Sequence, residues 1–576
     1  MRQVLKIAGP LLIISGLLGC MDRTKTSTPD KIPVLKRGEL ISCGRMEEGF
    51  GTISFDLTIP DSLRNAFNTA VALLHSFEYD EAEKQFARII DVHPDCAMAY
   101  WGVAMSNFHP LWTPPDKSEI EKGQQMVGIA RSIKNKTARE SAYIEAIARF
   151  YDSAQSLPHR TRVLRFETAM AGLHQEYPGD LDATVFYALA LNAAADQTDK
   201  TLSKQQKAIT ILMPIFEKQP LHPGVAHLII HNCDDPNLAA RALPAARKYA
   251  SIAPASAHAQ HMPSHIFIRL GLWEESISSN RAAASSAICY AEQAGINGHW
   301  DEELHALDYL MYAYLQQGDD SSAKRLVEYV QGMDLVSPFN FKVAYAFAAI
   351  PARYYLERKQ WHEAAELKMD PPTGSLKDFP WQQAIVHFTR LLGQVHTGKI
   401  SAAKNELVKL QDLHQFLVSQ KEKEMETRQV SVLMQTAKAW LTFYQGNRAD
   451  AIKLMANAAE LEDGMAKHPV SPGEILPARE MFADMLLQAG QPIEALNEYK
   501  QVLQSHALRF NALHGALIAA YKSGDKQSAR EFYNSLQSIL KTGSPRKELR
   551  EARQLMDLAA QSASAQSGAK KSLTAL

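Results

Sequence analysis

The sequence has little of several features that would point to a particular class of protein. It contains five cysteines in 576 residues, and Lys plus Arg (62) almost balance Asp plus Glu (63). A chain without a net charge of either sign has no long-range field that attracts nucleic acid or an anionic membrane surface. Hydrophobic residues make up 46% of the chain, which is enough for an extensive core. The composition therefore argues against nucleic-acid binding and predicts a folded chain.

Common catalytic signatures are also missing. The sequence has no glycine-rich phosphate loop, no GxSxG turn and no paired-cysteine zinc motif. Cys233 lies close to His231, but its thiol is interpreted as a small buried group rather than a nucleophile. Cys43, Cys96, Cys233 and Cys289 have no spacing typical of a disulfide framework, so the sequence predicts no particular disulfide.

The first twenty residues differ from the rest of the chain. Arg2 and Lys6 precede an apolar stretch at residues 7–18, which has the length of a signal peptide and is too short for a membrane span. The stretch ends in LLGC, which resembles the lipobox of bacterial lipoproteins. This resemblance implies cleavage before Cys20 and a diacylglycerol on its thiol. Met21 stands where an Asp would imply retention at the inner membrane. We therefore expect a lipid-anchored protein of the bacterial cell envelope, at the outer membrane and facing the periplasm.

A pattern typical of helix pairs recurs from residue 61 onward. The spacing A-x3-F-x2-A-x4-P, with substitutions, is found at Ala82, Phe86, Ile89 and Pro94; at Ala208, Leu212, Ile215 and Pro220; and at Ala242, Ala246, Tyr249 and Pro254. The last two copies lie 34 residues apart, and this spacing resembles the tetratricopeptide repeat. The resemblance implies an all-α fold, a right-handed solenoid of about ten antiparallel helix pairs over residues 61–540.

These features divide the chain into five segments. The sequence predicts a lipoprotein signal peptide at 1–19, a lipidated cysteine and polar tether at 20–60, an N-terminal array with a histidine cluster at 61–290, a C-terminal array at 291–545, and a helix end with a disordered tail at 546–576. Within the tether, residues 52–57 alternate apolar and polar side chains, which favours a short strand.

Histidines gather in one part of the array. Of 20 in the chain, eight fall within residues 222–305. His227 and His231 are four residues apart, and His261 and His265 repeat this spacing 34 residues later. Residues four apart lie on one face of a helix, about 6 Å from each other. In tetratricopeptide proteins these positions of the first helix point into the concave groove, so the resemblance implies that both pairs line it.

The resemblance adds further residues to the same groove, from the neighbouring turns and from the next repeat. Imidazoles and carboxylates on adjacent helices suit a divalent transition metal such as zinc, iron, manganese or nickel. The predicted metal ligands are His227, His231, His261, His265, His305 and Asp308, and the predicted groove contacts are His258, Asp234, Tyr312, His75, His109 and Trp101. Either the last three form an aromatic and imidazole wall for a ligand, or they belong to repeat packing.

Two classes of function remain open at this point. One is a lipid-anchored scaffold that binds a peptide, protein or glycan partner in its groove. The other is a metal-binding protein, or a metal-dependent hydrolase or oxidase that uses the histidine cluster and a bound water. Neither histidine pair has the HExxH form of zinc peptidases, and Pro263 disfavours regular helix just before it. A polar groove without metal explains the same histidines. A role in nutrient uptake rests on analogy of architecture alone.

Overall fold

The computed structural model describes residues 34–43, 49–111, 114–196, 198–368, 371, 374–420, 423–544 and 546–558. The signal peptide, Cys20 and the tail from residue 559, all predicted from the sequence, lie outside the described residues. The described residues from Leu35 onward belong to one compact unit, which contains helices α1 to α25. None of these helices is long and apolar enough to cross a lipid bilayer.

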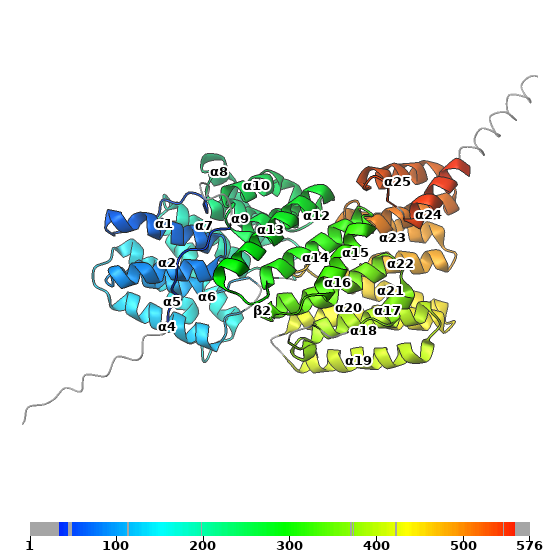
Figure 1. Ribbon diagram of the computed structural model, residues 1–576, viewed down its shortest axis with the longest axis horizontal. Helices are drawn as coiled ribbons and strands as arrows, with labels where there is room; N and C mark the ends of the chain where they lie inside the picture. Colours follow the sequence, from blue (N-terminus) through cyan, green and yellow to red (C-terminus); the bar gives the residue numbers. More distant parts are fainter. Residues whose placement is uncertain are drawn as a thin grey trace, which may run out of the picture. The chain divides into compact units, whose positions relative to one another are not determined.

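The helices follow one another along the chain with few other elements between them (Figure 1). The first thirteen are α1 (Asp61–His75), α2 (Tyr79–Val92), α3 (Ala97–Ser106), α4 (Lys117–Ser132), α5 (Ala138–Tyr151), α6 (His159–Glu176), α7 (Leu181–Ala193), α8 (Ser203–Lys218), α9 (Pro223–Asn232), α10 (Ala239–Ile252), α11 (Ala257–His261), α12 (Pro263–Arg269) and α13 (Trp273–Ala294). The others are α14 (Asp301–Gln316), α15 (Asp320–Gln331), α16 (Phe341–Glu357), α17 (Trp361–Ala365), α18 (Pro380–His396), α19 (Ile400–Ser419), α20 (Glu424–Tyr444), α21 (Arg448–Asp463), α22 (Ala478–Gln488), α23 (Pro492–Ser505), α24 (Phe510–Ser523) and α25 (Lys526–Ile539). A 3₁₀ turn, η1 (Leu376–Asp378), precedes α18, and β1 (His299–Trp300) pairs in parallel with β2 (Val336–Ser337).

Consecutive helices pack as antiparallel pairs. α1 packs on α2 and α3 on α4, and this order continues to α24 on α25, with α11 and α12 together forming the first helix of one pair. The first helices of neighbouring pairs also contact each other. For example, α7 contacts α9, α9 contacts α12, and α14, α16, α18 and α20 contact one another in turn. The fold is therefore the all-α helical solenoid that the repeat predicts, with twelve pairs in the described residues.

The signature residues of the repeat form the contacts between helices. Ala82 and Phe86 of α2 are fully buried, and a Cβ added to Gly102 of α3 would fall 2.3 Å from the Phe86 ring. Small residues at such positions let two helices approach closely. Gly271, in the turn between α12 and α13, has a φ of 69°, which glycine adopts without steric cost.

The segment before α1 lies on the array and does not form a free tether. The backbone N–H of Phe55 donates to the Asn68 side chain instead of a neighbouring strand, so the predicted strand is an extended segment without a strand partner. The prediction of a polar tether over 20–60 is therefore wrong for residues 35–43 and 49–60. The physical reason is that every second side chain in the last part of this segment is apolar and buried in the core: Ile53, Phe55, Leu57 and Ile59.

The predicted division of the array at 290/291 does not separate two bodies. It falls within α13, and α13 packs against α14. Beyond α25 the chain remains attached to the array, because Arg546 donates to the Asp320 carboxylate at 2.9 Å. Residues 547–558, which follow, are helical.

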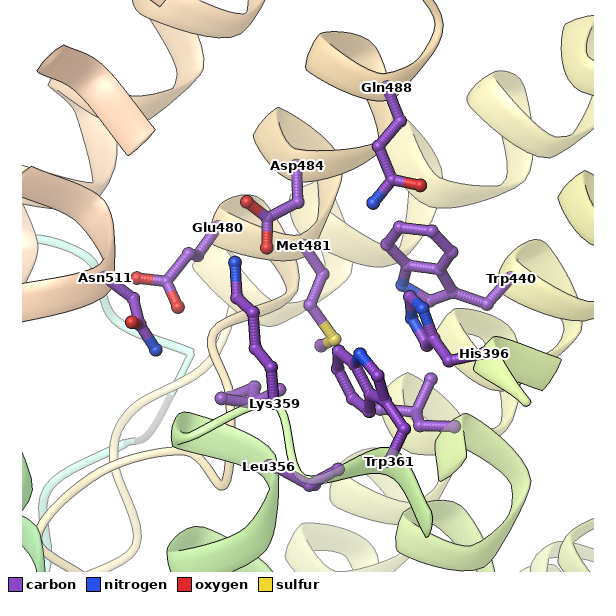
Figure 2. Close-up of a pocket in the computed structure, with 12 residues that line it drawn as sticks. Leu356, Lys359, Trp361, His396, Trp440, Glu480, Met481, Asp484, Gln488 and Asn511 are labelled. Atoms are coloured by element: carbon purple, nitrogen blue, oxygen red, sulfur yellow. The ribbon is translucent and has the colours of Figure 1, made fainter. Parts of the chain in front are cut away.

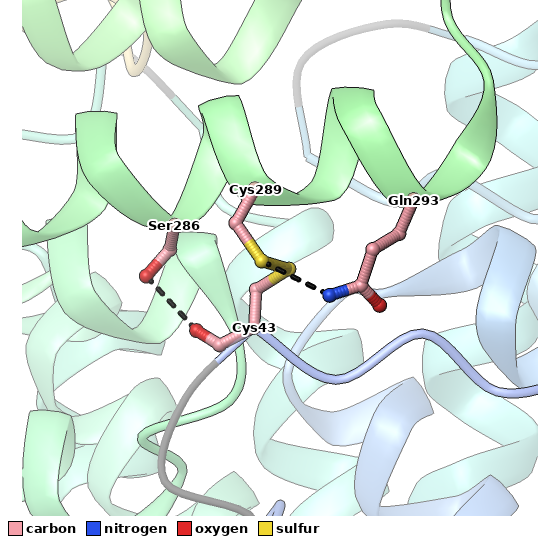
Figure 3. Close-up of a disulfide and its surroundings, with 4 residues drawn as sticks. All are labelled: Cys43, Ser286, Cys289 and Gln293. Atoms are coloured by element: carbon pink, nitrogen blue, oxygen red, sulfur yellow. Dashed lines mark hydrogen bonds between the residues drawn. A yellow bond between two sulfur atoms is a disulfide. The ribbon is translucent and has the colours of Figure 1, made fainter.

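A disulfide joins Cys43 to Cys289 on α13 (Figure 3). The Cα atoms are 5.8 Å apart, within the range of protein disulfides, and the Ser286 hydroxyl donates to the Cys43 carbonyl at 3.2 Å. Because the two cysteines are 246 residues apart in the chain, their spacing gave no sign of the pair. The bridge fixes the segment before α1 to a helix far along the array.

Replacing both cysteines of this disulfide by serine is expected to release residues 35–43 from α13. The same segment is held by Lys36 with Asp80 and by Arg37 with Asp91, but these ion pairs are exposed and contribute little. We expect a loss of about 2–4 kcal/mol in stability and faster trypsin cleavage after Lys36 and Arg37, followed by mass spectrometry. Dithiothreitol should reproduce both effects in the wild type and leave the double variant unchanged. Equal cleavage rates in all samples would contradict this prediction.

Candidate metal centre

Three consecutive helix pairs contribute the clustered histidines from their first helices. His227 lies on α9, His261 ends α11, His265 lies on α12, and His305 lies on α14. The chain breaks its helix between α11 and α12 because Pro263 cannot donate a backbone hydrogen bond, and Pro263 then begins α12. The break does not separate the second histidine pair, since the Nε2 atoms of His261 and His265 are 3.1 Å apart.

His261, His265 and His305 form one group, which we call triad B. Each offers a ligand atom, and these atoms all lie within 4.8 Å of one another. The rings of His261 and His305 have centroids 4.2 Å apart. All three side chains are nearly fully buried. Three imidazoles at this separation have the number and spacing of the protein ligands of a transition-metal site.

Hydrogen bonds indicate which ring nitrogens of His261 and His265 carry hydrogen. His261 Nδ1 is 2.7 Å from Asn280 Oδ1, and the Asn280 amide donates to the Ser276 carbonyl, which orients that oxygen toward the ring. His265 Nδ1 is 2.9 Å from the Asp234 carboxylate. Since both partners accept, both Nδ1 atoms donate, and in neutral rings both Nε2 atoms present lone pairs.

Two lone pairs 3.1 Å apart repel each other unless they share a cation. Two nitrogens bound to one tetrahedral zinc ion are about 3.3 Å apart, which is close to the observed separation. The second partners also follow the pattern of metal sites, where the other ring nitrogen donates to a carboxylate or an amide oxygen. Triad B therefore has the spacing of a metal site, and His261 and His265 have the tautomers that a bound metal ion requires.

His227, His231 and His258 form a second group, triad A, whose ligand atoms also lie within 4.8 Å of one another. His227 Nδ1 donates to the His75 carbonyl at 2.6 Å, so its Nε2 presents a lone pair. His258 Nε2 is 3.2 Å from this atom. A hydrogen on His258 Nε2 satisfies that contact as well as a metal does. Triad A therefore accommodates a metal ion but does not require one.

A third buried group, His75, Asp182 and His222, has a different character. His222 Nδ1 accepts from the backbone N–H of Val225 at the start of α9, so the neutral ring carries its hydrogen on Nε2. His222 Nε2 lies 3.5 Å from Asp182 Oδ1, which is longer than a good hydrogen bond, and His75 Nε2 lies 3.1 Å from the same oxygen. The Asp182 carboxylate thus already has one histidine partner, and we interpret the group as a polar layer between helices. His75 lies in it instead of in an open groove.

Burial favours the neutral form of five of the six imidazoles in the two triads. It lowers the pKa of His227, His231, His261 and His305 well below the usual value for histidine, and neighbouring imidazoles add to the effect. Burial also lowers the pKa of His265 to about 4, although Asp234 opposes this shift. Neutral imidazole is the form that binds metal, so at neutral pH these rings need no deprotonation before they coordinate an ion.

Asp234 supports triad B from outside. Burial raises the pKa of its carboxyl, but Lys467 and Arg269 outweigh burial and hold the pKa well below its usual range. Its oxygens are 2.9 Å from Arg269 Nε and 2.9 Å from Lys467 Nζ. The predicted groove contact is thus an ionised carboxylate that orients His265.

A small cavity of about 10 Å³ lies between the two triads, comparable to the space of one water molecule. Its lining residues are His231, His258, His265, His305, Glu302, Lys342, Pro469 and Val470. The last two belong to the connection between α21 and α22, which we call the 464–477 loop. Tyr309 donates to the carbonyl of Ser471 in this loop at 3.0 Å. The predicted groove is therefore covered at the histidines by another part of the same chain.

Other predicted site residues lie outside the triads. Asp308 Oδ1 is 3.2 Å from Arg353 Nε, and both side chains are buried. The prediction of Asp308 as a metal ligand is therefore not supported, because the carboxylate turns toward α16 and neutralises an arginine there. Tyr312 packs on Trp273 and is 3% exposed, so it offers no open groove contact.

The other two of the three residues considered for an aromatic and imidazole wall do not form one. Trp101 is 2% exposed and packs against Phe55 and Phe186, which makes it a core residue. His109 is partly exposed, and its Nε2 lies 2.9 Å from Glu119. Of the alternatives raised by the sequence, repeat packing describes Trp101.

Several residues around the triads were missed by sequence reasoning. Glu302 precedes His305 by three residues on α14, a helical spacing that could have drawn attention to it. Asn280 lies on the second helix of a pair, and Lys467 lies in a loop far along the chain. No sequence pattern connects these two with the histidines.

A larger cavity, of about 120 Å³, lies elsewhere in the array. Trp361, His396 and Trp440 line one side, and the Trp361 and His396 rings stack with centroids 3.8 Å apart. Figure 2 shows the Lys359 side chain extending toward Glu480 and Asp484 on the other side. The Asp484 carboxylate raises the pKa of Lys359 and keeps this ammonium charged. The cavity thus joins an aromatic wall to a charged wall.

Comparisons with known proteins add little to this description. No protein-family model matches the chain, and no curated protein matches it. Among solved structures, a monomeric mutant of IFIT1 with m7Gppp-AAAA is 12% identical with a TM-score of 0.32, covering 81% of this chain and 95% of that chain. Yeast Tom70 is 10% identical with a TM-score of 0.27, covering 87% and 96%. The TPR domain of P58(IPK) is 13% identical with a TM-score of 0.19, covering 86% and 99%. At this level of similarity the comparisons carry no information on ligand or partner.

Proposed function

We propose that this chain is a helical-repeat protein that binds a transition-metal ion at its buried histidines. One observation carries the proposal: the Nε2 atoms of His261 and His265 are 3.1 Å apart, and their Nδ1 partners make both of them acceptors. A metal ion bound to both nitrogens makes this contact favourable. A proton between them would instead give a charged imidazolium, which burial disfavours.

The ligand set narrows the choice of metal. Triad B consists of imidazoles alone, because Asp308 pairs with Arg353 instead. Imidazole suits zinc, copper, nickel and iron, whereas manganese prefers carboxylate and carbonyl oxygens. Of the metals expected from the sequence, zinc, iron and nickel therefore fit this set better than manganese, and copper joins them.

Elemental analysis tests the proposal. The untagged chain, purified after growth with added zinc, copper, nickel and iron, should contain near-stoichiometric metal. The variant His261→Ala/His265→Ala should lose metal from triad B, whereas His362→Ala, which removes an exposed histidine, should not. A wild-type chain that contains no metal after such growth and after direct metal titration would refute metal binding.

A second candidate function, binding of a peptide or protein partner, is supported by the larger cavity. The stacked Trp361 and His396 rings and the buried Trp440 offer an apolar surface, and Asp484 and Lys359 offer charges beside it. This combination suits a side chain that is apolar along its length and charged at its end.

Selection of displayed random peptides on the immobilised wild-type chain tests partner binding at this cavity. We expect enriched peptides to bind Trp361→Ala at least about tenfold more weakly, because one face of the aromatic wall is removed. Trp300→Ala, which changes an aromatic residue remote from this cavity, is the matched control. Enrichment of peptides that bind both variants as well as the wild type would place the partner surface elsewhere.

We further propose that the chain is anchored by lipid at Cys20 in a bacterial envelope, facing the periplasm. The support is the LLGC sequence at the end of an apolar stretch of signal-peptide length. Mass spectrometry of the mature N-terminus should find a diacylated cysteine, and Cys20→Ser should leave the protein in the soluble fraction. A mature chain that begins elsewhere or carries no acyl group would exclude the anchor.

A further inference from the structure

We infer that triads A and B together hold a pair of late first-row metal ions, copper or zinc, at neighbouring positions around one small cavity, with the Glu302 carboxylate as a ligand between them. This inference rests on the proposed metal binding and adds the number of ions, their common site and a carboxylate ligand.

The ring separations between the triads are similar to the longest separation within triad A. The His231 and His265 centroids, from different triads, are 6.0 Å apart, and those of His258 and His261 are 6.3 Å apart. The His231 and His258 centroids, within triad A, are also 6.3 Å apart. Members of both triads line the same cavity. Ions bound by the two triads would therefore be neighbours and not occupants of separate sites.

Glu302 lies on the cavity wall beside a member of each triad. Its Oε2 is 3.9 Å from His258 Nδ1, and the cavity it lines is also lined by His305. Its other oxygen, Oε1, contacts the Lys342 ammonium. This lysine therefore holds one carboxylate oxygen and leaves the second directed toward the histidines.

The charges around the cavity favour a carboxylate ligand at this place. Lys342 Nζ is 2.8 Å from Asp301 as well as in contact with Glu302, so one ammonium faces two carboxylates. Among these three groups one negative charge is left over, and a buried cation needs such a charge nearby. Imidazole-rich sites with few oxygen ligands suit copper and zinc among the late metals.

Metal counting and electron paramagnetic resonance together test the pair. The chelated full chain is titrated with zinc sulfate or copper sulfate, desalted and analysed for metal, and the copper form is examined by spin counting. We expect two ions per chain, and a spin count at least about twofold below the copper content, because paired ions about 4 Å apart are magnetically coupled. Glu302→Gln should raise the dissociation constants at least about tenfold and restore part of the spin count.

Matched variants separate the two triads. His261→Ala/His265→Ala and His227→Ala/His258→Ala should each keep one ion per chain, and circular dichroism of the metal-free variants checks that they fold. The wild-type count and spin measurement need no variant at all. One ion per wild-type chain would leave metal binding intact and overturn the pair. Two copper ions whose spin count equals the copper content would be uncoupled, and this result would exclude neighbouring ions at one cavity. A chain that binds no ion would refute the proposed function itself.

Discussion

The variant Arg509→Met is expected to lose about 3–5 kcal/mol of stability, because it leaves buried carboxylates without their cation. Arg509 is 0% exposed and lies just before α24. Its guanidinium donates to Glu480 of α22 at 2.7 and 2.9 Å and is 2.6 Å from Glu357 of α16. Three helices thus meet at one nearly fully buried ion network.

Urea and thermal unfolding measure this loss. Arg530→Met, which changes an exposed arginine on α25, should shift the midpoints little. The triple variant Arg509→Met/Glu480→Gln/Glu357→Gln should recover part of the stability, because it removes the unpaired charges along with their partner. If the single variant unfolded at the same urea concentration as the wild type, the buried network would contribute nothing.

Metal is expected to stabilise the wild type strongly and the triad B variant weakly. An ion that binds only the folded chain adds about 4 kcal/mol when its free concentration is 1,000 times the dissociation constant. We therefore expect the thermal midpoint to rise on addition of zinc or copper and to fall again with a chelator. In His261→Ala/His265→Ala the rise should be smaller, since triad A alone remains.

Scanning calorimetry or circular dichroism follows these midpoints. His362→Ala should respond to metal as the wild type does, because its side chain is exposed and remote from the triads. A rise of equal size in the wild type and the triad B variant would show that the ions bind elsewhere on the chain.

The helical solenoid could be predicted from the sequence because its determinants are local. The spacing of Ala82, Phe86 and Pro94 sets one helix pair, and the same spacing returns along the chain. The 34-residue period also predicted that His227 and His261 lie next to each other on neighbouring helices, since equivalent positions in neighbouring repeats lie side by side. These parts of the candidate site depend on short-range geometry.

The remaining parts depend on contacts between distant segments. Cys43 and Cys289 meet because the segment before α1 runs across the array to α13, which no spacing reveals. Asp308 was expected among the ligands on helical position alone, but the buried Arg353 competes for its carboxylate. For Trp101 the sequence left open a ligand wall or repeat packing, and a ring from the segment before α1 covers it. Burial and pairing of this kind depend on the whole tertiary structure.

The 464–477 loop makes this array less divisible than most repeat proteins. Where each repeat touches only its neighbours, a truncated chain keeps the structure of the repeats that remain. Here Lys467 and Ser471 reach back to Asp234 and Tyr309, so removing the chain beyond α21 would uncover histidines encoded far upstream. If truncated chains without the C-terminal repeats lost metal, the ligands would wrongly be assigned to those repeats. The same contacts should also make the two ends of the chain unfold cooperatively.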